Sequence, residues 1–269
     1  MREAVERATG RGVANARRVG GGCINEGWQV EFDDGERAFV KTRKEAGPGE
    51  YANEAKALEW LGEAVRVPRV LGVAEDLLAL EWIDEGTLTH ADELGRDLAA
   101  MHSAGADRFG GSAPLRIGSL EIPNEPLEDW PTFYAERRLM PLIDAAGPGA
   151  AAVEKVCANI DDLAGPPEPP ARLHGDLWGG NVLGDQDGHG WLIDPVAYGG
   201  HREVDLAMLR LFGAPSKRVF DAYQEASPLA EGHEQRVPLW QLFPLLVHAA
   251  LFGGHYVQQV ESTARALAR

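Results

Sequence analysis

The chain has 269 residues, and its 42 acidic against 26 basic residues give a net charge of −16 at pH 7. This charge disfavours nucleic acids and anionic membrane surfaces as partners, because both are themselves negative. The length allows a sizeable core and suits two lobes better than one. Only two cysteines occur, Cys23 and Cys157, too few for a disulfide framework, which favours a reducing compartment.

Neither end of the chain predicts contact with a membrane. Residues 1–12 carry charges where a signal peptide needs an apolar core. The longest apolar region, 239–257, is interrupted by histidine, proline and glycine, which favours buried helices over a membrane span. We therefore expect a cytoplasmic protein without a membrane partner.

A glycine-rich segment lies between two predicted strands near the N-terminus, the second of them at 28–32. Glycines let backbone N–H groups approach phosphate oxygens, as a nucleotide-covering loop requires. An ordinary hairpin turn is the alternative for this segment taken alone. The candidate nucleotide contacts are Gly20, Gly21, Gly22, Cys23, Ile24 and Asn25. Cys23 is either a small apolar residue or an oxidisable thiol.

An apolar strand at 38–41 ends in Lys41, at a position similar to that of the kinase lysine that pairs with the α and β phosphates. The helical spacing of apolar residues in 51–61 places Glu54 beside the apolar stripe, where it can orient Lys41. Glu50, one turn earlier, is the competing partner. A solvated helix face is the alternative role for either acid.

Residues 77–83 predict a buried strand that runs into a hinge, where backbone groups of Glu81 and Ile83 are candidate adenine contacts. We expect residues 1–83 to form an antiparallel sheet lobe with one helix. Residues 84–269 should form a mainly helical lobe, in which a helical insert at 129–146 walls the acceptor site. The predicted fold class is α+β.

The segment 173–183, LHGDLWGGNVL, carries the chemistry. His174, Asp176 and Asn181 fit the pattern H-x-D-x-x-x-x-N of a kinase catalytic loop, and Asp194 follows Asn181 after a short hairpin. Phosphoryl transfer requires an aligned hydroxyl and neutralised phosphate charge. We therefore assign Asp176 as the catalytic base, and Asn181 and Asp194 as ligands of Mg²⁺ bound with ATP. A turn stabilised by its own side chains is the alternative for the HGD triplet alone.

The chain resembles the fructosamine kinase (ketosamine-3-kinase) family, a branch of the protein-kinase-like two-lobed fold. The resemblance rests on the following segments: GGGCINEGW at 20–28, FVKT at 39–42, the catalytic segment at 173–183, LIDPVAYGGHREVDLAML at 192–209 and LFGGHY at 251–256. It implies ATP-dependent phosphorylation of the sugar O3 of small-molecule or protein-bound ketoamines, such as fructosamines or ribulosamines.

Three residues near the catalytic segment have further expected roles. Trp178 can stack on the sugar or pack the loop against the lobe. His201, where many family members carry an acid, is a second candidate substrate contact. Asp205, at the start of a helix, should bond to the backbone of the catalytic loop.

Two other functions stay open at this point. An aminoglycoside or choline-type phosphotransferase would share every nucleotide-site residue with a ketoamine kinase. A nucleotide-binding pseudokinase is disfavoured, because Lys41, Asp176, Asn181 and Asp194 are all present.

Overall fold

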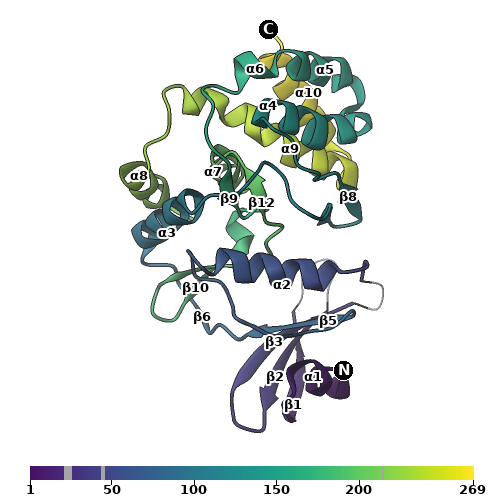
Figure 1. The fold of residues 1–269 in the computed structure, drawn as a ribbon, viewed down its shortest axis with the longest axis vertical. Coiled ribbons are helices and arrows are strands. Elements are labelled where there is room, and N and C mark those ends of the chain that lie inside the picture. The colour runs from purple at the N-terminus through teal and green to yellow at the C-terminus, as the bar shows by residue number, and fades with distance from the viewer. Residues whose placement is uncertain (21–25, 44–45, 214) are drawn as a thin grey trace. The chain divides into compact units, whose positions relative to one another are not determined.

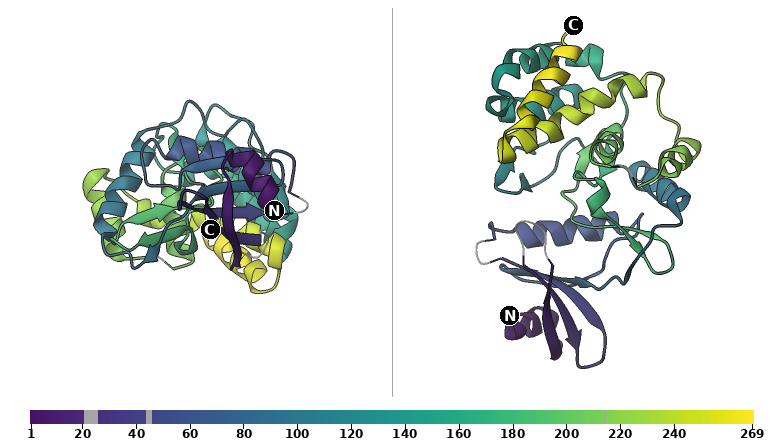
Figure 2. Two further views of the ribbon diagram at one scale, coloured as in Figure 1. Left: turned by 90° about the horizontal axis from the view of Figure 1, so that it is seen from below. Right: turned by 180° about the vertical axis from the view of Figure 1, so that it is seen from behind.

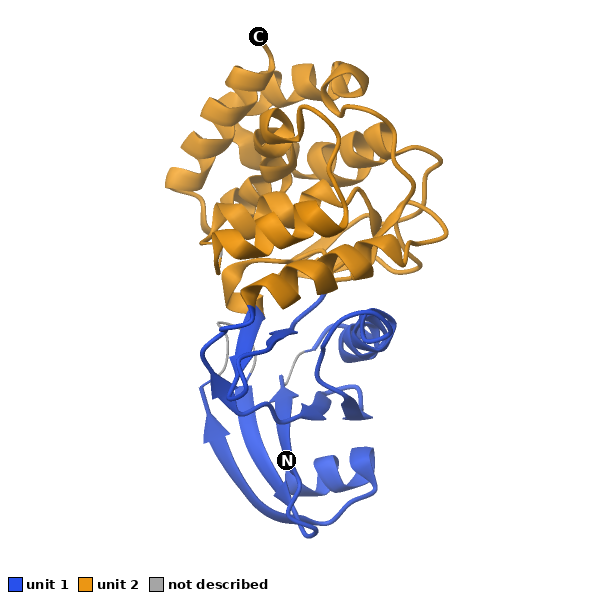
Figure 3. Ribbon diagram, turned by 90° about the vertical axis from the view of Figure 1, so that its left-hand side faces the viewer, with its two compact units in different colours: residues 1–90, 182–195 blue, residues 91–181, 196–269 orange. Residues whose placement is uncertain are grey.

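The computed structural model describes residues 1–20, 26–43, 46–213 and 215–269. The chain forms two compact units (Figure 1, Figure 3). The first comprises residues 1–90 and 182–195, and the second comprises residues 91–181 and 196–269. Each unit is described separately below.

The first unit is built on a five-stranded antiparallel sheet with the strand order β1-β2-β3-β5-β4. The strands are β1 (Val13–Val19), β2 (Glu26–Phe32), β3 (Arg37–Thr42), β4 (Val70–Val73) and β5 (Leu77–Glu81). Alternate side chains of a strand point to opposite faces, so each face can bury its own apolar set. Leu77 and Ala79 pack with Val5 of α1 (Arg2–Thr9). Leu78 and Leu80 pack with α2 (Glu50–Leu61), which lies along the sheet in Figure 1.

A second, three-stranded sheet in this unit explains why its boundaries differ from the predicted division at residue 83. Strand β10 (Val182–Asp185) pairs with β11 (Gly190–Leu192) and with β6 (Glu85–Gly86). The pairing with β6 places residues 182–195, which the sequence assigned to the second lobe, in the first compact unit.

The second unit is mainly helical, which together with the antiparallel sheet of the first unit confirms the α+β class. Its helices are α3 (Ala91–Ser103), α4 (Trp130–Tyr134), η1 (Ala135–Leu139), η2 (Met140–Gly149), α5 (Ala150–Ala158), α6 (Ile160–Leu163), η3 (Gly179–Asn181), α7 (Glu203–Leu211), α8 (Lys217–Ala226), α9 (His233–Phe252) and α10 (His255–Leu267). Its strand pairs are β7 (Leu115–Ile117) with β8 (Leu120–Ile122), and β9 (Ala171–Leu173) with β12 (Tyr198–Gly200). Helices α9 and α10, in yellow-green and yellow, lie side by side (Figure 2).

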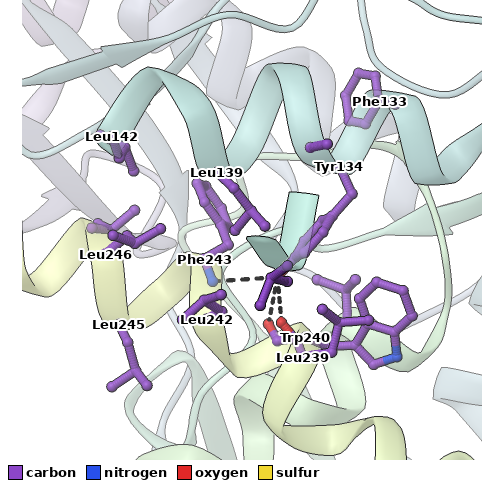
Figure 4. Close-up of a cluster of buried hydrophobic side chains, with 14 of the residues drawn as sticks. Phe133, Tyr134, Leu139, Leu142, Leu239, Trp240, Leu242, Phe243, Leu245 and Leu246 are labelled. Atoms are coloured by element: carbon purple, nitrogen blue, oxygen red, sulfur yellow. Dashed lines mark hydrogen bonds between the residues drawn. The ribbon is translucent and has the colours of Figure 1, made fainter. Parts of the chain in front are cut away.

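The insert at 129–146 contributes to the core of this unit. Phe133 and Tyr134 are buried in a cluster with Leu239 and Phe243 of α9 (Figure 4), and Trp130 belongs to the same cluster. The Tyr134 hydroxyl donates to the Leu239 carbonyl at 2.8 Å, which satisfies its only donor inside an apolar cluster. The aromatic side chains of the insert therefore stabilise the unit from within.

A buried polar group lies next to this core. Arg236 donates to Glu203 from Nε at 2.9 Å, and the Trp240 indole N–H donates to the same carboxylate at 2.8 Å. The His201 ring stacks on Trp240 with a centroid distance of 5.3 Å and is 3% exposed. The backbone N–H of Glu203 donates to His201 Nδ1 at 3.3 Å, so that nitrogen carries no proton.

No helix within the described ranges is both long and apolar enough to cross a membrane.

We expect the burial of His201 to make the free energy of unfolding depend on pH. Burial lowers the pKa of this imidazole, although the charges of Glu203 and Glu168 act in the opposite direction. Because the pKa in the folded state lies below that in the unfolded state, the stabilisation is complete above about pH 6.5. It is lost as the pH falls through the folded-state pKa, by up to about 1.4 kcal/mol per pH unit.

Denaturant unfolding between about pH 7.5 and about pH 5.5 measures this dependence. His201→Phe keeps a ring against Trp240 but cannot be protonated, so its stability should fall less steeply with decreasing pH. Equal slopes in the two proteins would contradict the assignment.

Candidate active site

Lys41 is the centre of a charge cluster in the first unit. Strand β3 places it between Gly27 of β2 and Leu78 of β5, and its side chain is buried, with the residue 4% exposed. Its Nζ donates to Glu54 Oε1 at 2.7 Å and to Asp194 Oδ1. The structure thus brings together three residues that the sequence selected.

The two carboxylates keep Lys41 positively charged. Burial by itself would lower the pKa of this amine, but the charges and hydrogen bonds of Glu54 and Asp194 outweigh it and raise the pKa above its usual value. The amine is therefore fully charged at neutral pH and suited to binding phosphate.

Glu54, and not Glu50, is the partner of Lys41 on α2. Glu50 instead accepts hydrogen bonds from the Arg43 guanidinium and from the Gly47 backbone N–H, the latter at 2.9 Å. The two acids lie one helical turn apart, and only Glu54 lies beside the apolar stripe that packs on the sheet. This geometry resolves the alternative that the sequence left open.

Asp194 has an unusual backbone conformation. Among the described residues it is the only one other than glycine with a positive φ, at 57°. Asp tolerates this left-handed region better than most residues, and such conformations persist where the surrounding structure enforces them, often at functional sites. The turn directs the carboxylate to Lys41 and leaves it half exposed.

The candidate nucleotide loop connects β1 and β2, which pair as an antiparallel hairpin from Val13 with Phe32 to Val19 with Gly27. Gly20 follows β1 directly and is exposed. The other candidate contacts of this loop lie outside the described residues: Gly21, Gly22, Cys23, Ile24 and Asn25.

The predicted hinge follows β5. The Glu81 N–H donates to the Arg69 carbonyl at 2.8 Å, so this donor is already used within the sheet. Glu81 could therefore offer only its carbonyl to an adenine ring. Ile83 lies beyond the end of the strand and is half-buried.

The catalytic loop lies in the second unit and follows β9. Asn181 Nδ2 donates to the Asp176 carboxylate at 3.0 Å and to its carbonyl at 2.8 Å. The Asp176 N–H donates to His174 Nδ1 at 3.2 Å. The structure therefore confirms that His174, Asp176 and Asn181 lie together. The amide nitrogen of Asn181 is used in these bonds, and its carbonyl oxygen is the atom that a hard cation would bind.

The position between His174 and Asp176 is occupied by Gly175, and not by an arginine, for two structural reasons. Its φ is 83°, and a Cβ atom here would lie 2.4 Å from the Val196 carbonyl oxygen. Both the backbone conformation and the lack of space require glycine.

Asp205 fixes the backbone of the catalytic loop through two hydrogen bonds. It is 1% exposed, and its carboxylate accepts the backbone N–H of His174 at 2.7 Å and that of Gly175 at 3.0 Å. The expected structural role of Asp205 is confirmed.

Trp178 remains at the surface of the second unit, 38% exposed. Its ring lies over Gly180, where a Cβ would come within 2.2 Å of the indole. Gly179 passes close to the chain after α7, since a Cβ there would lie 2.4 Å from the Gly213 carbonyl oxygen. Glycine at these two positions thus leaves room for the Trp178 ring and for the chain after α7.

His201 does not fit the predicted substrate contact. Its ring is enclosed by Trp240 and Trp130, and its Nε2 lies 3.8 Å from Glu168. The prediction considered its position beside the catalytic segment but not its burial. We assign His201 to the interior of the unit.

Sequence reasoning missed the polar residues that surround Asp205. His102 on α3 and Tyr223 on α8 join it through buried hydrogen bonds, although they lie far away along the chain. A single histidine or tyrosine within a helical pattern gives no local signal of such a contact. Glu168, an isolated acid among prolines, pairs with Arg202.

Comparison with known proteins places this geometry in context. The family model for fructosamine kinase matches residues 1–269. A probable ketoamine kinase of Synechocystis is 35% identical over 262 residues, covering 93% of this chain and 88% of that protein. The chloroplastic protein-ribulosamine 3-kinase of Arabidopsis thaliana is 35% identical over 255 residues, covering 88% and 78%.

Solved structures agree with these relatives. A candidate fructosamine-3-kinase from Thermobifida fusca is 46% identical with a TM-score of 0.92, covering 99% of this chain and 98% of that one. A macrolide 2'-phosphotransferase of type I, 16% identical with a TM-score of 0.63 and coverages of 99% and 95%, shares the fold alone. The fold is therefore the two-lobed kinase-like α+β fold, and the chain belongs to the fructosamine kinase family.

Proposed function

We propose that this protein is an ATP-dependent kinase that phosphorylates the sugar O3 of ketoamines such as fructosamines or ribulosamines. The observation that carries the kinase activity is the charge cluster in which Lys41 joins Glu54 and Asp194. The ketoamine substrate is supported by the names of relatives that cover most of the chain.

The first unit would bind the nucleotide. Lys41, kept charged and oriented by Glu54, pairs with the α and β phosphates. Residues 20–25 would cover the phosphates with backbone N–H groups. The Glu81 carbonyl and the Ile83 backbone would receive the adenine ring.

Two residues have the donor atoms that magnesium prefers, namely a carboxylate on Asp194 and an amide carbonyl on Asn181. We propose that both are ligands of the metal. Magnesium, when bound with ATP, supplies positive charge that offsets the charge of the phosphates.

Asp176 would act on the acceptor. Its carboxylate, held by Asn181 Nδ2, accepts the proton of the sugar hydroxyl as the oxygen attacks the γ-phosphate. Positioning dominates this type of catalysis, which is why the backbone bonds to Asp205 matter. Trp178, two residues later and partly exposed, would offer a ring to the apolar face of the sugar.

The acceptor would be a small-molecule ketoamine or the same group on a protein, and we propose a cytoplasmic location. An aminoglycoside or choline-type acceptor is the second candidate, because kinases with these acceptors use the same set of nucleotide-site residues. The presence of Lys41, Asp176, Asn181 and Asp194 disfavours a pseudokinase.

A panel of acceptors tests the proposal. Purified protein with ATP and magnesium should phosphorylate fructosyl-lysine or ribulosyl-lysine adducts, with the phosphate on O3 by NMR. Choline and aminoglycosides serve as comparison acceptors in the same assay. Efficient turnover of one of these with no turnover of any ketoamine would overturn the substrate class and leave the kinase assignment intact.

Asp176→Asn should leave ATP affinity nearly unchanged and lower turnover by about two to four orders of magnitude, because the positioned base is lost. Nucleotide titration and steady-state kinetics on the same preparation measure the two quantities. Near-normal turnover would remove Asp176 from the role of base.

Asp194→Ala should weaken nucleotide binding most when magnesium is present and should abolish transfer. The exposed Asp187, in the same hairpin, provides a matched control, and Asp187→Ala should behave like the wild type. ATP affinity is measured with and without magnesium for all three proteins. An unchanged effect of magnesium on affinity in Asp194→Ala would contradict its role as a ligand.

A further inference from the structure

We propose that His102 and Tyr223 are positioning residues that orient the Asp205 carboxylate and, through it, the catalytic loop. The inference rests on the proposed kinase activity, since it assigns the loop its role. Neither residue would touch the substrate or the nucleotide.

A continuous chain of hydrogen bonds connects the three side chains. His102 on α3 is 3% exposed, and its Nε2 lies 3.3 Å from Asp205 Oδ2. Its Nδ1 lies 2.8 Å from the Tyr223 hydroxyl on α8. The two helices that carry these residues pack against each other directly. All of these groups belong to the second unit.

The chemistry of the partners determines the tautomer of His102. The Asp205 carboxylate can only accept, so Nε2 must carry the proton that it donates. In the neutral ring Nδ1 is then an acceptor, to which the Tyr223 hydroxyl donates. Burial raises the pKa of the Tyr223 phenol, which keeps this proton in place.

At the other end of this series of hydrogen bonds, the Arg202 guanidinium is held in a fixed orientation. The Arg202 guanidinium lowers the pKa of the Tyr223 phenol, in opposition to the larger effect of burial. Arg202 itself makes two bonds to Glu168, at 2.7 and 2.8 Å, and donates to the Ser227 hydroxyl at 2.6 Å. Two charge-assisted bonds in parallel fix the plane of a guanidinium group.

The two carboxylate oxygens of Asp205 accept different numbers of hydrogen bonds. Oδ1 accepts the Gly175 N–H, whereas Oδ2 accepts both the His174 N–H and His102 Nε2. The Asp205 carboxylate can rotate about its Cβ–Cγ bond, and the hydrogen bond from His102 on α3 opposes that rotation. Since Gly175 is the residue before Asp176, a rotated carboxylate would shift the proposed base.

Two substitutions of His102 separate its two nitrogens. The amide nitrogen of Gln lies where Nε2 lies in histidine, so His102→Gln keeps a donor to Asp205. The amide of Asn reaches only the position of Nδ1, so His102→Asn keeps polarity near Tyr223 but withdraws the donor. Both variants lose the imidazole ring, so both lose the packing that the ring provides.

Tyr223→Phe tests the chain from its other end with the ring retained. Tyr134→Phe is its matched control, because Tyr134 is also buried in the second unit and its hydroxyl donates at 2.8 Å, but to the backbone of α9. Tyr223→Phe removes the hydrogen bond to His102, and Tyr134→Phe removes those to the backbone of α9. Only Tyr223 is joined to Asp205.

The measurements are turnover per nucleotide-binding site, the KM for ATP and the melting temperature. Counting sites by ADP titration removes the effect of misfolded protein. We expect His102→Asn and Tyr223→Phe to lower turnover per site about tenfold with the KM for ATP unchanged, because small displacements of a catalytic group have large effects on rate. His102→Gln should retain most of the turnover. Tyr134→Phe should lower the melting temperature alone.

Equal turnover per site in His102→Asn and His102→Gln, or wild-type turnover in Tyr223→Phe, would overturn the positioning role. If the His102 variants do not fold, the turnover per site of Tyr223→Phe alone tests the positioning role. The assay uses whichever acceptor the protein turns over best. If no ketoamine is accepted, the proposed substrate falls, while the comparison among variants still tests the positioning role.

Discussion

The conformation of the candidate catalytic loop depends on the hydrogen bonds that the buried Asp205 carboxylate accepts from the loop backbone. A charge in the interior is tolerated only where enough donors satisfy it, and here two backbone N–H groups and an imidazole do so. In return, the carboxylate fixes the backbone at Gly175, whose left-handed conformation no other residue would adopt easily. The conformation of the loop is thus set from the interior of its unit.

A comparable constraint operates in the first unit, where the charge has the opposite sign. Lys41 is buried in the sheet, and its amine is satisfied by two carboxylates that reach it from α2 and from the turn after β11. Removing either acid would leave a buried charge with fewer partners, which is strongly unfavourable. In each unit a functional side chain or segment is held by buried charges of opposite sign or by strong donors. Preorganisation of this kind is what phosphoryl transfer requires of a protein.

Much of this arrangement could be predicted from the sequence, because the decisive residues are close together along the chain. His174, Asp176 and Asn181 lie within one loop, and Lys41 was identified as the last residue of an apolar strand, similar in position to the kinase lysine. The choice between Glu50 and Glu54 was open, since both lie on the same helix and only packing on the sheet separates them. The division between the lobes was displaced because pairing of β10 with β6 leaves no mark in composition.

The remaining features depend on contacts between distant segments. His102 contacts Asp205, which lies 103 residues away along the chain, and Tyr223, which lies 121 residues away, and nothing in the local patterns indicates these contacts. His201 was proposed as a substrate contact because it stands where many members of the family carry an acid, whereas stacking on Trp240 places it in the interior. The insert at 129–146 was expected to wall the acceptor site; its aromatic side chains contribute to the core, and its place at that site stays a prediction.

The protonation of His102 tests the central claim most directly. In a protein with ¹⁵N-labelled histidine, the two-bond ¹H–¹⁵N correlation spectrum reports which ring nitrogen carries the proton, and His102→Gln assigns the signal. If His102 holds the Asp205 carboxylate as described, its ring will carry a proton on Nε2. A proton on Nδ1 of the neutral ring, with Nε2 bare, would leave Asp205 without its third donor and would contradict the account.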